Sequence, residues 1–109
     1  MKIALIGSGN VATVLGRLII KNGHEVCQVI SREADHAKTL ADELGASYTN
    51  FEGTPDRSAD LFIIAISDAA LDNFFVKGAI NDKIVVHTAG SVGKDILRNF
   101  ASRYGVLYP

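Results

Sequence analysis

Several residue types are scarce in this sequence. Its 109 residues include no tryptophan, one cysteine and two prolines. A single cysteine, Cys27, excludes an internal disulfide. Because its neighbours in sequence are not basic and no helix is expected to begin there, we expect the Cys27 thiol to pack in the core rather than to react.

An excess of one charge is also missing. Lys and Arg number 11 against 12 Asp and Glu, which gives a net charge of −1. This balance argues against nucleic acid or an anionic membrane as a partner. No apolar run approaches the length of a membrane span, and the run Ile3 to Ile6 stops at Gly7 without the cleavage site of a signal peptide. We therefore expect a cytoplasmic protein.

Clustered metal ligands are absent from the sequence as well. His24, His36 and His87 fall on different predicted elements. None of them has a cysteine or acidic partner at the spacing that metal ligands need. We therefore predict no metal site.

Short apolar runs alternate with longer segments of helical periodicity, which is typical of βαβ units. We expect strands at residues 2–6, 25–30, 47–49, 61–66, 83–86 and 105–108, helices from residue 10, over 33–44, 68–75 and 91–102, and a loop over 50–58. The spacing of apolar residues in the first helix predicts one buried face, formed by Val11, Val14, Leu15, Leu18 and Ile19. The predicted fold is one α/β domain over residues 1–109, a doubly wound parallel sheet of about six strands with helices on both faces.

A glycine motif, Gly7-x-Gly9-x-x-Ala12, joins the first strand to the first helix. In this context Gly7 permits a tight turn, Gly9 lets the backbone approach a pyrophosphate, and Ala12 keeps the helix close to the strand. The alternative is that the glycines only turn a strand into a helix. The strand before the motif and the amphipathic helix after it favour a Rossmann dinucleotide site, for which the predicted phosphate-binding residues are Gly7, Ser8, Gly9, Asn10, Val11 and Ala12.

The residues that end the second strand bear on the choice of cofactor. NAD-binding domains of this type place an acidic residue there, whereas this chain has Ser31 and Arg32. A hydroxyl and a guanidinium can bind a 2′-phosphate, so we predict NADP(H), with NAD as the alternative. Two readings compete: Ser31 only caps the second helix and Arg32 is a solvated residue, or Glu33 lies at the ribose and NAD is preferred.

Ligands of such sheets lie beyond the carboxyl ends of the strands. We therefore expect Ala65, Ile66, Ser67 and Asp68 after the fourth strand, and His87 and Thr88 after the fifth, to contribute to the cofactor site. His87 is also the candidate catalytic residue, as a proton donor or a group that orients a carbonyl. The alternatives are helix capping by Ser67 and Asp68 and a purely structural histidine.

Five segments carry a resemblance to known families: Ile6-Gly7-Ser8-Gly9-Asn10-Val11-Ala12, Ser31-Arg32, Ala65-Ile66-Ser67-Asp68, His87 to Ser91, and Tyr104 to Pro109. The chain resembles the N-terminal domains of pyrroline-carboxylate reductases and deazaflavin-dependent NADP reductases. Above all it resembles bacterial oxidoreductases that pair a Rossmann-like domain with a helical C-terminal domain of undefined function. The resemblance implies that this chain is the cofactor-binding domain of a reductase or dehydrogenase, and that the domain is not active alone. It implies a helical substrate and dimerisation domain, absent from this chain, and a homodimer of the full-length protein.

These observations favour an oxidoreductase domain that binds NADP(H) and exchanges a hydride with a small-molecule substrate. A second hypothesis is a non-catalytic module that senses NAD(P) and controls a partner, which the fold alone does not distinguish from an enzyme. A methyltransferase is disfavoured because Ile30 and Ser31 stand where an acidic residue is expected to hold the ribose of S-adenosylmethionine.

Overall fold

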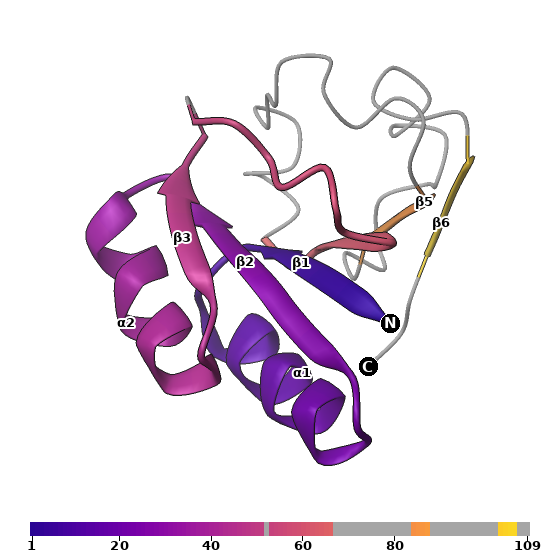
Figure 1. The fold of residues 1–109 in the computed structure, drawn as a ribbon. Helices are drawn as coiled ribbons and strands as arrows, with labels where there is room; N and C mark the ends of the chain where they lie inside the picture. The colour runs from indigo at the N-terminus through magenta and orange to yellow at the C-terminus, as the bar shows by residue number, and fades with distance from the viewer. Residues whose placement is uncertain (52, 67–83, 88–102, 107–109) are drawn as a thin grey trace.

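The computed structural model describes residues 1–51, 53–66, 84–87 and 103–106, the last four and His87 by their backbone alone. Its elements are β1 (Lys2–Ile6), α1 (Asn10–Lys21), β2 (Glu25–Ser31), α2 (Ala34–Leu44), β3 (Ser47–Asn50), β4 (Leu61–Ile64), β5 (Ile84–His87) and β6 (Arg103–Val106). The six strands are parallel in the order β3-β2-β1-β4-β5-β6 (Figure 1). The order reverses between β1 and β4, so the predicted doubly wound sheet is confirmed.

The strand boundaries differ from the sequence prediction by one or two residues. Strand β2 includes Ser31, because Ser31 pairs with Asn50 of β3. Strand β4 ends at Ile64 rather than at residue 66, since the chain turns away once Ala65 N–H has bonded to the Ile6 carbonyl at 2.7 Å. Strands β5 and β6 are shifted by one and two residues. The helices predicted over 68–75 and 91–102 lie outside the described residues.

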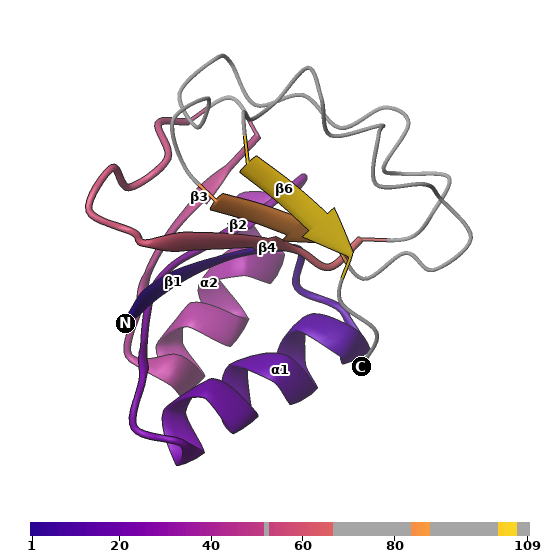
Figure 2. The ribbon, with the colours of Figure 1, turned by 90° about the vertical axis from the view of Figure 1, so that its right-hand side faces the viewer.

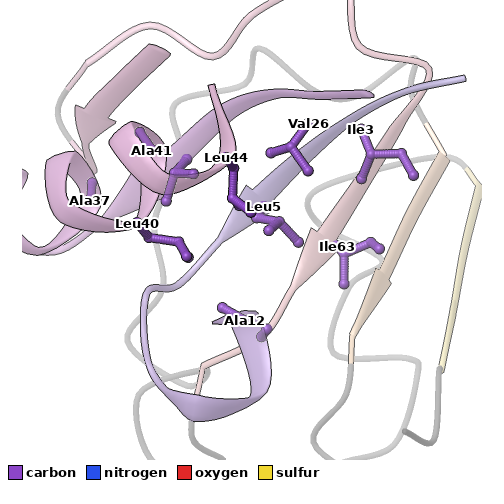
Figure 3. Packing of buried hydrophobic residues seen from close by; sticks show 11 residues of the cluster. Ile3, Leu5, Ala12, Val26, Ala37, Leu40, Ala41, Leu44 and Ile63 are labelled. Atoms are coloured by element: carbon purple, nitrogen blue, oxygen red, sulfur yellow. The ribbon is translucent and has the colours of Figure 1, made fainter. Parts of the chain in front are cut away.

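Helices α1 and α2 lie on the same side of the sheet (Figure 2). Between them and the strands is a hydrophobic cluster, drawn as sticks in Figure 3. It is made of Ile3, Leu5, Ala12, Val26, Val29, Ala37, Leu40, Ala41, Leu44, Ile63 and Ala65. Helix α2 ends at Leu44, and its C-cap Gly45 has a φ of 71°, a left-handed conformation that glycine tolerates. Neither described helix is long and apolar enough to cross a membrane.

The prediction for the buried face of α1 was wrong in part. Leu15 and Ile19 pack against the core, but Val11, Val14 and Leu18 are 41%, 53% and 47% exposed. The contact with the sheet is made instead by small residues, the buried Ala12 and Gly16. Gly16 lies so close to Leu44 and Leu5 that an added Cβ would be 2.6 Å from a Leu44 methyl carbon. Small residues on the contact face bring the helix axis near the sheet, which leaves the flanking valines outside.

The connection from β3 to β4 is a loop, as predicted, and it crosses the side of the sheet opposite to α1 and α2 (Figure 2). Gln28 of β2, 6% exposed, holds this loop with its side-chain amide. Its Nε2 donates to the Thr54 carbonyl at 3.2 Å, and its Oε1 accepts from Asp56 N–H at 2.7 Å. The Asp56 carboxylate accepts bonds from the backbone N–H of Ser58 at 2.9 Å and from its hydroxyl at 2.7 Å. These bonds satisfy backbone groups that a crossover helix would satisfy internally.

Cys27 lies beside this loop, where β2 has one residue more than β1: Val26 pairs with Ile3, and Gln28 pairs with Ala4. The thiol is half-buried. Burial and, to a lesser degree, the neighbouring Asp56 carboxylate raise its pKa to about 11. Since the thiolate is the reactive form, both effects favour an unreactive packed thiol.

A matched pair of leucines tests the packing of α1 and β1. Leu5→Ala, at a fully buried position, is expected to cost about 2 to 5 kcal/mol of unfolding free energy through lost transfer energy and a cavity. Leu18→Ala, at a half-exposed position, is expected to change it by less than about 1 kcal/mol. Urea titration of both variants measures the difference. Equal losses would contradict the assignment of Leu18 to the exposed face.

The Cys27 thiol is expected to react slowly with Ellman's reagent. At about pH 8 the raised pKa lowers the thiolate fraction about 100-fold relative to a thiol of unperturbed pKa, so the native rate should fall by a similar factor. Asp56→Asn removes the nearby anion and is expected to speed the reaction, whereas Asp42→Asn on α2 is the control. A native rate equal to that of the urea-unfolded chain would contradict the burial.

Candidate dinucleotide site

The turn between β1 and α1 is built on Gly7. Its φ is +122°, which side chains rarely tolerate, and an added Cβ would collide with the carbonyl oxygen of Ala65. The turn is fixed from the other side by Gly7 N–H, which donates to the Ile30 carbonyl at 2.6 Å. Gly7 thus lets the chain leave β1 in close contact with the ends of β2 and β4.

Gly9 is the N-cap of α1, and its surroundings are different. Its φ is −80°, and an added Cβ would meet no atom of the described residues within 4 Å. The first N–H groups of a helix have no partner inside it, and the helix dipole is positive at that end. The first turn of α1 holds no acidic residue that would repel an anion. This helix start can therefore accept a phosphate, and Gly9 leaves room for it.

A hollow of about 280 Å³ lies at the carboxyl edge of the sheet. Four neighbouring strand ends contribute its described lining, which consists of Gly7, Ser8, Gly9, Ser31, Arg32, Phe51, Ala65 and Ile66. The hydroxyls of Ser8 and Ser31 lie 3.1 Å apart and link the glycine turn to β2. Ser31 is 7% exposed, whereas Arg32 is exposed at the rim. The polar groups of the described lining are therefore hydroxyls, backbone groups and one guanidinium.

The structure shows where Ser31, Arg32 and Glu33 lie. The N-cap of α2 is Glu33, so Ser31 does not cap that helix. The Glu33 carboxylate lies 3.8 Å from His36 Nε2, and its side chain is 68% exposed. It is not among the described residues that line the hollow, none of which is acidic. The described lining thus contains Ser31 and Arg32 but no carboxylate.

The predicted site residues fall into three groups. Seven line the hollow together: Gly7, Ser8, Gly9, Ser31, Arg32, Ala65 and Ile66. Asn10 and Val11 line a neighbouring depression along α1, and Ala12 is buried beneath the turn. The predictions for Ser67, Asp68, Thr88 and the side chain of His87 lie outside the described residues; the backbone of His87 ends β5 next to Ile64 of β4.

Phe51 is a lining residue that sequence reasoning missed. It follows Asn50, the last residue of β3, and is half-buried. Its position after a strand was a usable signal, because residues there meet at the ligand edge of a parallel sheet.

The metal-ligating side chains are scattered over the part of the chain that the structure describes. That part contains no group of three His, Cys, Asp or Glu residues that could hold an ion.

The comparisons with known proteins agree with this geometry. Residues 2–91 match the family described as "NADP oxidoreductase coenzyme F420-dependent". Among curated proteins, none matches the chain. The crystal structure of a "putative NADP oxidoreductase" from Bacteroides fragilis superposes with a TM-score of 0.86 at 35% identity, over 99% of this chain and 43% of that one.

Two more distant structures share the fold. An imine reductase from Myxococcus stipitatus in complex with NADP⁺ has a TM-score of 0.71 at 18% identity, over 95% of this chain and 39% of that one. A 1-pyrroline-5-carboxylate reductase from Streptococcus pyogenes has a TM-score of 0.69 at 20% identity, over 93% and 38%. This chain thus spans less than half the length of each of the three proteins. By its sequence match and its fold, the chain belongs to the family of coenzyme F420-dependent NADP oxidoreductases, as a Rossmann-type NAD(P)-binding domain.

Proposed function

We propose that this domain binds NADP(H) in preference to NAD(H), and that it serves an enzyme that transfers a hydride between the nicotinamide and a small-molecule substrate. The observation that carries the proposal is the contrast between Gly7, which is packed, and Gly9, which faces open space at a helix start. No described neighbour requires a glycine at position 9. A Cβ there would stand between a phosphate and the helix N–H groups, so a bound ligand explains why the residue is glycine.

The preference for NADP(H) rests on the end of β2. The Ser31 hydroxyl and the Arg32 guanidinium can both donate to a 2′-phosphate. No described lining residue is a carboxylate, which would bind the two ribose hydroxyls of NAD and repel the phosphate. The pyrophosphate would bind at Gly7, Ser8, Gly9 and the first turn of α1, including Asn10, Val11 and Ala12.

The nicotinamide half would extend past β4 toward β5, where Ala65, Ile66, Ser67, Asp68 and Thr88 are the proposed contacts. When bound, the nicotinamide supplies the hydride chemistry. His87, at the end of β5, is the proposed residue that holds a proton or orients the substrate carbonyl. We further propose that a helical domain beyond this chain holds the substrate and joins two subunits, and that the protein is cytoplasmic.

Gly9→Ala tests the pyrophosphate site. Because the backbone conformation suits alanine and the added methyl meets no protein atom, we expect an unchanged melting temperature. NADPH affinity, measured by calorimetric titration, should fall at least about tenfold as the methyl displaces the pyrophosphate.

The comparison variant for Gly9→Ala is Gly7→Ala, which should lose stability through its collision with Ala65. Full NADPH binding by Gly9→Ala would argue against this site, and an absence of binding of either nicotinamide cofactor by the native chain would refute the proposed function.

Arg32→Ala tests the 2′-phosphate contact. We expect a loss of about 1.5 to 3 kcal/mol in NADPH binding, the range for hydrogen bonds to charged groups, while NADH binding stays nearly unchanged. Arg17→Ala is the control, because it removes the same charge from an ion pair with Glu43 between α1 and α2, outside the hollow. Equal NADPH affinity in native and Arg32→Ala proteins would leave Arg32 without the proposed role.

A further inference from the structure

One flank of α1 is an apolar surface that the described residues leave uncovered. Val11, Val14 and Leu18 are 41%, 53% and 47% exposed. Val11 and Val14 also line a depression of about 260 Å³ along the helix. The three residues stand at i, i+3 and i+7, the spacing of side chains that anchor one helix against another. Exposed aliphatic clusters of this kind mark protein contact surfaces.

This flank faces away from α2. Successive residues of a helix are about 100° apart, so Val11 and Leu18 lie on one side of the buried Ala12. Arg17 lies on the other side, where it pairs with Glu43 of α2 at 2.7 Å. The flank of Val11 and Leu18 is therefore turned toward the β4–β5 half of the sheet. In Figure 2, which looks from the β6 side, no described element lies in front of α1.

The sheet continues this apolar surface beyond α1. Leu61 of β4 and Val86 of β5 are half-buried and pack against the same hydrophobic cluster as Leu15 of α1. Side chains alternate along a strand, so Ile84, two residues before Val86, lies on the same face of the sheet. Ile84 is 40% exposed and is the register partner of Leu61. We call six residues together the α1–β5 face: Val11, Val14, Leu18, Leu61, Ile84 and Val86.

The apolar pattern of α1 is wider than the contact that this domain makes. The spacing predicts five buried residues, yet only Leu15 and Ile19 pack against the core. The remaining three are the exposed residues of the α1–β5 face. An amphipathic helix places its apolar stripe against other protein atoms. The exposed part of the stripe therefore indicates a partner outside the described residues.

From these observations we infer that the α1–β5 face is the docking surface for polypeptide that follows this domain in a longer protein, and that the docked segment is a helix with an aliphatic face. The inference rests on the proposed function, which includes a helical domain beyond this chain, and deepens it by assigning that domain its contact surface. The chain covers 43% of the similar Bacteroides fragilis protein. More than half of that protein thus lies outside the matched part and is long enough to supply such a segment.

Two features favour this occupant over a second copy of the domain. Strand β6 is parallel to β5 and ends at Val106, so the chain leaves it at the carboxyl edge of the sheet, the edge at which α1 begins. A tethered segment also reaches the face at an effective concentration on the order of millimolar, far above the concentration of a second copy in dilute solution.

Cysteine protection in the longer protein tests the docking. Val14→Cys places a thiol on the α1–β5 face, and Ile20→Cys, at a 42% exposed position on the α2 side of the same helix, is the matched control. Alkylation by N-ethylmaleimide is followed at each site by peptide mass spectrometry. The thiol of Val14→Cys should react at least about tenfold more slowly in the longer protein than in the 109-residue chain, because docking covers it. The thiol of Ile20→Cys should react at the same rate in both.

Leu18→Lys is the second arm of this test. Leu18 is half-exposed in this domain, so the lysine is compatible with its fold, but it places a charge in the middle of the proposed contact. Added to Val14→Cys in the longer protein, it should restore alkylation to within about threefold of the rate in the 109-residue chain. Ile20→Lys adds the same charge on the other flank and should leave the protection intact.

Equal alkylation of Val14→Cys in both proteins would overturn the docking surface, and so would protection that Leu18→Lys does not relieve. Protection already present in the 109-residue chain and lost on dilution would assign the face to a second copy, which also overturns the inference.

Titration of the 109-residue chain with NADPH keeps this inference apart from the proposed function. If the chain binds NADPH while Val14→Cys is unprotected in the longer protein, the docking surface fails and the proposed function stands. If the chain binds neither nicotinamide cofactor, the proposed function fails, whatever the protection of Val14→Cys.

Discussion

The contact between the β1–α1 turn and the end of β4 is the constraint on which the site depends. Gly7 can make it because it has no side chain to collide with Ala65 and because its φ of +122° is accessible to glycine. With the turn in this place, α1 begins beside the hollow that Gly7, Ser8 and Gly9 help to line. Any larger residue would move the helix start away from the strand ends.

Parallel register then brings distant parts of the chain to this edge. Ser8 and Ser31 are 23 residues apart in sequence, yet their hydroxyls are 3.1 Å apart because β1 and β2 end at the same level. The polar groups of the described lining are mainly backbone and hydroxyl groups, with Arg32 the only described cation. A nearly neutral chain can therefore bind an anionic cofactor locally, and its net charge carries no information about that site.

Sequence reasoning succeeded where the cause is local and failed where it is tertiary. The roles of Gly7 and Gly45 follow from backbone conformations that glycine tolerates, so both turns were predictable. The exposure of Val14 was not, because periodicity identifies an apolar face without saying which part of it the sheet covers. Phe51 was missed although its position directly after a predicted strand was a usable signal; its place in the hollow also depends on the pairing of β3 with β2.

Gln28 holds the loop between β3 and β4 against the sheet. A crossover without a helix leaves backbone groups that need partners, and a buried amide without partners would itself be costly. The Gln28 amide and the loop satisfy one another, because the amide donates one hydrogen bond to a loop carbonyl and accepts one from a loop N–H. The loop is consequently held against the sheet within five residues of Phe51. Loss of the Gln28 amide should therefore lower the stability of the fold, because it would leave the Thr54 carbonyl and the Asp56 N–H without these partners.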